Sequence, residues 1–287
     1  MGEGRQRDAA GRDRRVAVLT ARRSAVKACT AAINQIKSLL VTAPPDLRER
    51  YRHHARTKLI QTLARCRPSM HSDPTALAVL IACKALAQRA EFLQQQERNL
   101  TTQLDELVTA INPGLLAAYG IGPDTAAQLI ITAGGNPERL RSEASFAALC
   151  GTAPVPASSG KTQRHRLSRG GDRAANNALY RVALVRMSSD KRTRDYVTRQ
   201  VAKGRSKMEI LRLLKRALAR EVFRLLTTVC EVDDYSDLRP ARQHKNITLT
   251  AVAQHFGVWP TVISRLERGL QRDDALAADY RQWLTAA

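Results

Sequence analysis

Hydrophobic positions along the chain recur at helical spacing and rarely alternate with polar ones. Over residues 16–41 the apolar side chains return every three, four or seven positions, which places them on one face of a helix. Pro44 and Pro45 end this segment, and a second helix is expected over residues 46–64. We therefore predict an all-α fold, a helical bundle that begins with a basic helical segment at residues 1–72.

A heptad pattern follows over residues 73–112. Asp73 can cap the N-terminus of a helix, and Pro74 suits its first position. Two apolar rows repeat every seven residues, with Glu97 as the exception: Val79, Leu86, Leu93, Leu100 and Leu107, and Ala76, Cys83, Ala90, Leu104 and Ile111. This spacing predicts a coiled-coil helix that joins copies of the chain into a homo-oligomer. The alternative is one long core helix inside a bundle.

Residues 112–130 read as a short helix, a Gly-Ile-Gly turn and a second helix, after the break at Asn112, Pro113 and Gly114. This is a helix-hairpin-helix pattern. Gly120 and Gly122 would let the backbone approach a DNA phosphate, with N–H groups at a helix start directed at the anion. The alternative is an ordinary tight turn between helices.

The stretch over residues 157–173 is polar and strongly cationic. Ser158 and Ser159 precede Gly160, and five cationic side chains follow: Lys161, Arg164, Arg166, Arg169 and Arg173. Most serine and glycine stretches of this kind are only turns. Here, however, the cations are of the kind that stabilise charge on a phosphoryl group, and a serine hydroxyl among them could attack a phosphodiester.

The C-terminal segment, residues 246–287, has the spacing of a helix-turn-helix domain. Thr248 can cap a first helix, a Gly-Val turn follows, and Pro260 opens a second helix. The pattern resembles the phage-repressor class, although Trp259 stands where that class usually has a capping Ser or Thr. Its base-reading candidates are Thr261, Val262, Ser264 and Arg265. The alternative is a small helical bundle, and an acidic, polar linker at residues 231–245 precedes either form.

Composition points to a polyanionic partner. The formal net charge is +21 and the sequence pI is about 10.7, so the chain carries a strong excess of positive charge that nucleic acid would neutralise. Five isolated cysteines show no zinc-ligand spacing. The sequence holds no apolar segment of membrane-spanning length and no signal core. We expect a cytoplasmic, nucleoid-associated protein that binds DNA.

Residues 146–186 resemble the C-terminal transposase domain of the insertion-sequence one-ten family. The likeness rests on the run from Cys150 to Pro154, the Ser-Ser-Gly stretch, the basic run, the Leu-Ser-Arg-Gly-Gly-Asp-Arg stretch and the helix that holds Asn176. It extends over about residues 14–230, with the transposase domain at 113–230. The resemblance implies a DNA transposase or site-specific recombinase in which Ser159, with Ser158 second, is the nucleophile.

The resemblance also implies partners and a cofactor. Some members of the family use a structured guide RNA, and a resolvase-like domain with four Mg²⁺-binding acidic residues precedes the coiled coil. This chain begins after the place of that domain. We therefore expect a truncated transposase, incomplete alone, that binds no cofactor itself and carries an appended helix-turn-helix. The alternatives are a transcriptional regulator that uses the helix-turn-helix without catalysis, and a non-catalytic nucleic-acid scaffold.

Overall fold

The computed structural model describes residues 2–70, 73–134, 140–156, 165–166, 170–228, 232–269 and 272–286, and this part of the chain is all-α, as predicted. Its only strands are β1 (Val155–Pro156) and β2 (His165–Arg166). The α-helices are α1 (Gly2–Val41), α2 (Pro45–Arg52), α3 (Arg56–Ala64), α4 (Pro74–Thr109), α5 (Pro113–Ala117), α6 (Pro123–Ala133), α7 (Glu143–Leu149), α8 (Arg173–Ser189), α9 (Lys191–Ala202), α10 (Lys207–Thr227), α11 (Leu238–His244), α12 (Leu249–His255), α13 (Pro260–Glu267) and α14 (Asp274–Ala286). A 3₁₀ turn, η1 (Pro68–Met70), precedes α4.

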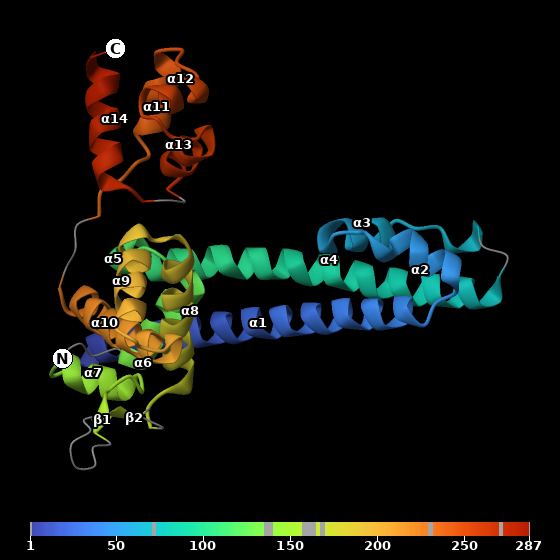
Figure 1. The fold of residues 1–287 in the computed structure, drawn as a ribbon, viewed down its shortest axis with the longest axis horizontal. Helices are drawn as coiled ribbons and strands as arrows, with labels where there is room; N and C mark the ends of the chain where they lie inside the picture. The colour runs from blue at the N-terminus through green and yellow to red at the C-terminus, as the bar shows by residue number, and fades with distance from the viewer. Residues whose placement is uncertain are drawn as a thin grey trace. The chain divides into compact units, whose positions relative to one another are not determined.

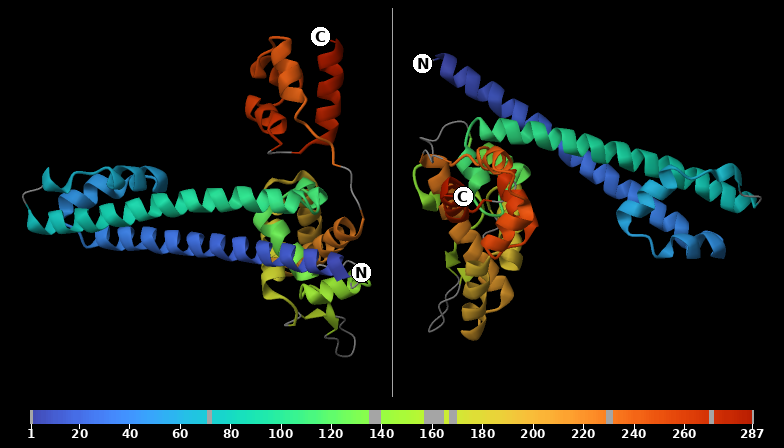
Figure 2. Two further views of the ribbon diagram at one scale, coloured as in Figure 1. Left: turned by 180° about the vertical axis from the view of Figure 1, so that it is seen from behind. Right: turned by 90° about the horizontal axis from the view of Figure 1, so that it is seen from above.

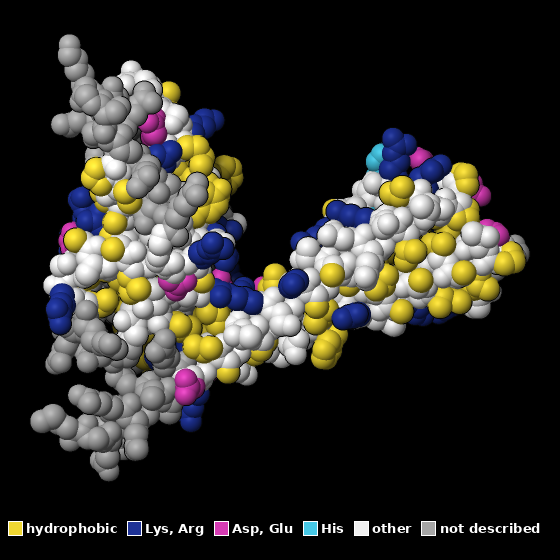
Figure 3. Space-filling model, turned by 90° about the horizontal axis from the view of Figure 1, so that it is seen from below, with side chains coloured by type: hydrophobic (Ala, Val, Ile, Leu, Met, Phe, Trp, Pro, Cys, Tyr) yellow, Lys and Arg dark blue, Asp and Glu magenta, His cyan; other side chains and the backbone are white. Residues whose placement is uncertain are grey.

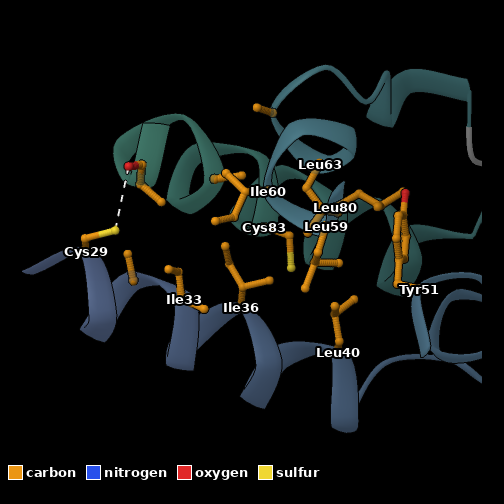
Figure 4. Packing of buried hydrophobic residues seen from close by; sticks show 14 of the residues in the cluster. Cys29, Ile33, Ile36, Leu40, Tyr51, Leu59, Ile60, Leu63, Leu80 and Cys83 are labelled. Atoms are coloured by element: carbon orange, nitrogen blue, oxygen red, sulfur yellow. Dashed lines mark hydrogen bonds between the residues drawn. The ribbon is translucent and has the colours of Figure 1, made fainter. Parts of the chain in front are cut away.

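The two long helices α1 and α4 form an antiparallel hairpin, with α2 and α3 packed at the end where the chain turns back (Figures 1 and 2). Asp73 begins α4 as predicted, because its carboxylate accepts hydrogen bonds from the N–H groups of Thr75 and Ala76 at 3.1 Å each. Ile33, Ile36 and other apolar side chains of α1 meet those of α3 and α4 in one buried cluster (Figure 4). The sequence sets this packing, since each helix carries one apolar face.

The apolar rows of α4 pack against α1 of the same chain. Of the predicted seam positions, five are buried (Ala76, Cys83, Ala90, Leu93 and Leu104), four are half-buried (Val79, Leu86, Leu100 and Leu107) and Ile111 is exposed. Leu80, Ala87 and Val108, which lie one position beyond the half-buried row, are buried instead. The heptad therefore builds an intramolecular helix pair, and its role in joining copies of the chain stays a prediction.

Glu97, the exception in the heptad, has a partner that explains it. The guanidinium of Arg22 in α1 donates to Glu97 Oε1 at 3.0 Å, to Thr101 Oγ1 at 2.8 Å and to Asp124 Oδ1 of α6 at 3.0 Å. Only 15% of the Arg22 side chain is exposed. One arginine thus ties α1, α4 and α6 together where the apolar seam becomes polar.

The predicted single helix over residues 46–64 is wrong, because the structure has two helices there. His53 ends α2, and Ala55 is extended, with ψ 152°, before α3 starts. The turn lets Leu47 of α2 and Leu63 of α3 both enter the buried cluster of the hairpin. In one straight helix these two side chains would lie on different faces and could not both enter the cluster. Tertiary packing therefore overrides the continuous local helical signal.

Helices α11 to α14 surround a separate apolar cluster near the C-terminus, which includes Val252, Ile263 and Leu284. An ion pair lies inside it. Arg242 donates to both carboxylate oxygens of Glu267, at 2.6 and 3.0 Å, and the Tyr280 hydroxyl donates to Glu267 Oε1 at 2.9 Å. The Glu267 side chain is only 2% exposed, so each of its oxygens depends on these donors.

Replacing Glu267 by Ala tests this network. We expect the C-terminal helices to lose about 3–5 kcal/mol of unfolding free energy, because Arg242 would remain buried without its partner. Urea unfolding of the full chain would be followed by the fluorescence of Trp283, which packs against this cluster, in a Trp259→Phe background.

The matched control is Asp237→Ala, which removes the ion pair with Arg281. The side chains of this pair are 53% and 34% exposed, so the expected loss is about 1 kcal/mol or less. Equal losses in the two variants would contradict the assignment of Glu267 to a buried, stabilising pair.

Candidate nucleic-acid interface

A short antiparallel strand pair brings together the two ends of the predicted serine segment. Val155 pairs with Arg166, and Pro156 pairs with His165. Ser158, Ser159, Gly160, Lys161, Arg164 and Arg169 lie outside the described residues, as does the side chain of Arg166. We call residues 157–164 the serine loop. The structure describes the strand pair on either side of it and not the loop itself.

Two glycines make close backbone contacts below the serine loop. Gly151 has φ +62° and Gly171 has φ +87°. A Cβ atom at Gly171 would lie 2.6 Å from the backbone N of Gly151 and 2.6 Å from the carbonyl oxygen of Leu149. A Cβ at Gly151 would lie 2.6 Å from the carbonyl oxygen of Gly170. Only glycine fits both positions, because both the dihedral angles and the contacts exclude a side chain.

Asp172 follows this contact and caps α8. Its backbone N–H donates to the Leu149 carbonyl at 2.7 Å, and its Oδ1 accepts from the N–H groups of Ala174 and Ala175 at 2.7 and 3.3 Å. Its Oδ2 accepts from the Thr132 hydroxyl at 2.5 Å. Burial alone would raise the pKa of Asp172, but these hydrogen bonds outweigh it and hold the pKa below its ordinary value.

Asn176, one turn into α8, completes the contact from the other side. Its Nδ2 donates to the carbonyl oxygens of Cys150 and Gly151, both at 2.9 Å. We call Gly151, Gly171, Asp172 and Asn176 the glycine clamp. The clamp fixes the turn that precedes β1 against the start of α8.

Two residues of α6 that the sequence analysis missed support the clamp. Thr132 and Gln128 both donate to Oδ2 of Asp172, Gln128 at 3.3 Å, and Gln128 also donates to Thr132 at 3.0 Å. Gln128 is buried. The available signal was the spacing of Gln128 and Thr132, which are four positions apart and therefore lie on one face of a helix that is otherwise apolar after Thr125.

The two glycines of the hairpin pattern differ in their surroundings. Gly120 has φ +80°, and a Cβ there would touch Val185 of α8 at 3.4 Å, so conformation and packing explain this glycine. Gly122 is the N-cap of α6 without a side-chain cap, and a Cβ there would meet nothing within 4 Å. Phosphate contact at Gly120 and Gly122 stays a prediction, and the open backbone of Gly122 is the better candidate.

Arg173 is the cation of the basic run that the structure describes fully. It is the first residue of α8, directly after the clamp residue Asp172, and it is exposed. On the face drawn in Figure 3, Lys and Arg side chains outnumber those of Asp and Glu. This face therefore carries the excess of positive charge that the composition predicts.

The C-terminal segment has the predicted pair of helices. Thr248 caps α12 by accepting from the Ala251 N–H at 3.1 Å, and Gly257, with φ +63°, makes the turn. Trp259 is the N-cap of α13, forms no side-chain cap and is 80% exposed. Ile263 and Leu266 face inward, as expected.

The predicted base-reading residues lie on the remaining faces of α13. Thr261 and Arg265 are exposed, and Val262 and Ser264 are half-buried. The backbone carbonyl of Ser264 accepts from Nε of Arg268 at 3.0 Å. Arg265 is thus the cationic side chain of this set that could reach a base edge.

Comparison with known proteins finds a family match around the clamp. Residues 114–198, which hold the hairpin glycines, the serine loop and the clamp, match the model of the transposase IS116/IS110/IS902 family. This part of the chain is therefore similar to an IS110-family transposase domain, as the motif resemblance predicted.

A protein of Streptomyces coelicolor (strain ATCC BAA-471 / A3(2) / M145) described as "Insertion element IS110 uncharacterized 43.6 kDa protein" is 31% identical to the chain over 149 residues. The alignment covers 51% of this chain and 36% of that protein. The chain thus spans about a third of the length of the curated relative that it matches.

The helices and side chains of the described residues show neither a membrane span nor a metal cluster. None of these helices combines the length and apolar character needed to span a bilayer. The described His, Cys, Asp and Glu side chains form no group of three or more that could hold a metal ion.

Replacing Asp172 by Ala tests the clamp. We expect a loss of about 1 kcal/mol in unfolding free energy, because the variant lacks the cap of α8, and a loss of DNA strand transfer because the serine loop is no longer held. The matched control is Asp190→Ala, which removes the cap of α9. That variant should lose similar stability but retain strand transfer, and equal loss of strand transfer in both would contradict the positioning role.

The loss of unfolding free energy caused by Asp172→Ala or by Asp190→Ala should depend on pH. The pKa values of Asp172 and Asp190 are both lowered in the folded chain, so each carboxylate stabilises the fold above its unfolded pKa of about 4. This contribution is lost as the pH falls through the lowered folded pKa. Urea unfolding would be measured for each variant and the parent at pH 7 and at pH 3. The difference in unfolding free energy between variant and parent should be smaller at pH 3.

Proposed function

We propose that the chain is a DNA transposase or site-specific recombinase of a mobile insertion element, and that Ser159 is its nucleophile. The glycine clamp is the observation that carries this proposal. It holds the turn at Cys150 and Gly151 against the start of α8, and the β1 and β2 pair lies between this contact and the serine loop, inside the segment that matches the transposase family. A loop that serves only as a turn would not require such a base.

The proposed reaction uses the residue types of the basic run. The hydroxyl oxygen of Ser159 attacks the phosphorus of a phosphodiester, the bond to the leaving sugar oxygen breaks, and that oxygen takes up a proton. The serine ester keeps the bond energy until a hydroxyl of another strand attacks the phosphorus and releases the serine. Lys161, Arg164, Arg166 and Arg169 would stabilise the negative charge on the phosphoryl oxygens, with Arg173 at the base of the loop.

The remaining partners belong to the same proposal. Mg²⁺ would be held by the acidic residues of a resolvase-like domain that works together with the serine. A structured guide RNA and a second copy of the chain would assemble with the DNA. The open backbone at Gly122, the N-cap of the 11-residue helix α6, supports a phosphate contact by the hairpin.

A second candidate function is DNA-binding transcriptional regulation through α12 and α13. It is supported by the separate apolar cluster of α11 to α14, which gives the two helices α12 and α13 a core of their own. In that case the serine would have no role. The two candidates differ in which residue matters, Ser159 or Arg265.

The first test replaces Ser159 by Ala in the mobile element that encodes this chain. We expect excised or inserted element DNA to fall below detection, because no other group would form the ester with the DNA. Polymerase chain reaction across the element junction measures both products. Ser158→Ala is the control and should retain activity; the opposite result would assign the nucleophile to Ser158, and full activity in both variants would refute serine catalysis.

The second test replaces Arg265 by Ala in the full chain. The probe is duplex DNA that the parent protein has selected from a random library. We expect the variant to bind this DNA with a loss of about 1–3 kcal/mol in binding free energy, and to lose less for unselected DNA. Fluorescence anisotropy at fixed salt measures both. The control is Arg268→Ala, which removes the same charge from the exposed end of α13. It should weaken the binding of selected and unselected DNA equally. Equal effects of the two variants would argue against base reading by Arg265.

A further inference from the structure

A cavity of about 610 Å³ lies at the end of the α1 and α4 hairpin where the chain turns back. It is formed mainly by α2, α3 and the turn after α3, all of which precede the serine loop by many residues in the sequence. This volume is in the range of small-ligand sites. Its lining residues are Arg50, Tyr51, Gln61, Thr62, Arg65, Cys66, Arg67 and Leu80. Neither the transposase match, at residues 114–198, nor the helix-turn-helix includes any of them.

The charge around the cavity is positive and uncompensated. Arg50, Arg65 and Arg67 contribute three exposed guanidinium groups, and no carboxylate is among the lining residues. None of the three forms an ion pair with another described residue. The neighbouring Glu49 is engaged elsewhere, with Arg52 at 3.4 Å. Guanidinium groups gathered in this way suit a phosphate group, which can accept several of their hydrogen bonds.

The rest of the lining suits more than a bare phosphate ion. Leu80 and Tyr51 line the cavity although they are buried, at 1% and 6% exposed, so they give it a narrow apolar wall. Both side chains belong to the packed cluster of the hairpin (Figure 4). Gln61 and Thr62 are exposed and add an amide and a hydroxyl, which can donate and accept hydrogen bonds. An apolar wall, polar hydrogen-bonding groups and a phosphate site together match the three parts of a nucleotide.

We propose that this cavity, the arginine pocket, binds a nucleotide unit, either free or within a single strand of nucleic acid. The phosphate lies on Arg50, Arg65 and Arg67, and the base lies along Leu80 and Tyr51. A paired and stacked duplex does not present such a unit, so the arginine pocket discriminates against it. The hairpin end is then a third nucleic-acid contact, distinct from the serine loop and from α13.

Cys66 provides a direct readout of occupancy. It is half-buried in the arginine pocket, whereas Cys29, Cys83 and Cys150 are buried. Burial raises the pKa of the Cys66 thiol, so alkylation is best measured at mildly alkaline pH. In a full-length Cys230→Ser chain, the rate of reaction of Cys66 with iodoacetamide would be followed by mass spectrometry of the peptide that contains it.

The experiment compares four probes at equal ionic strength: inorganic phosphate, a mixture of nucleoside 5′-monophosphates, single-stranded octamers of RNA and DNA, and a duplex octamer. We expect at least one nucleotide-containing single-stranded probe to slow alkylation of Cys66 about tenfold, with little protection by phosphate or duplex. Protection by the monophosphates identifies a free nucleotide as sufficient. Protection by the octamers alone identifies a unit within a strand.

Matched triple variants separate the arginine pocket from general charge. The first variant combines Arg50→Gln, Arg65→Gln and Arg67→Gln. It should bind the protecting ligand about tenfold more weakly or worse, because the ligand's charged hydrogen bonds are lost. Arg48→Gln, Arg52→Gln and Arg56→Gln remove the same charge from exposed positions of α2 and α3 that do not line the cavity. These should bind like the parent, with circular dichroism confirming that both variants fold.

Two results would overturn the inference. One is the absence of protection by every nucleotide-containing probe. The other is equal weakening in both triple variants, which would show a diffuse electrostatic attraction. Neither result bears on the transposase proposal, since the arginine pocket shares no residue with the serine loop, the glycine clamp or α13.

Discussion

The contact between Gly151 and Gly171 is the constraint on which the candidate active region depends. These glycines let two backbone segments approach more closely than any side chain would allow. Asp172 and Asn176 then tie α8, the turn after α7 and helix α6 to the same point through hydrogen bonds. Rigid support of this kind is what a serine needs if its oxygen is to meet a phosphate in one geometry.

Two charged residues inside helical packing serve different parts of the chain in a similar way. Arg22 joins three helices of the hairpin region through Glu97, Thr101 and Asp124. Glu267 is enclosed by Arg242 and Tyr280 in the C-terminal helices. Each charge is taken from water, and each is matched by partners with direct hydrogen bonds, so it specifies one arrangement of the surrounding helices.

The separation of features along the chain suggests how one polypeptide could hold several strands of nucleic acid. The serine loop, α13 and the arginine pocket use different residues, and the roles proposed for them differ in chemistry: a nucleophile among cations, side chains for base edges, and an open cationic cavity. Exposed Lys and Arg side chains elsewhere in the chain would add attraction that does not depend on sequence. Specific positioning would then come from the three sites.

The sequence by itself determined the helical class, the cap at Asp73, the two helices of the C-terminal motif and the transposase resemblance, because these follow from local spacing and from short motifs. The intramolecular partner of α4, the break between α2 and α3, and the support of Asp172 by Gln128 and Thr132 could not be predicted. They depend on side chains that are distant in sequence and meet only after folding. The same is true of the arginine pocket, whose residues carry no motif and share a cavity only because α2 and α3 fold back on the hairpin.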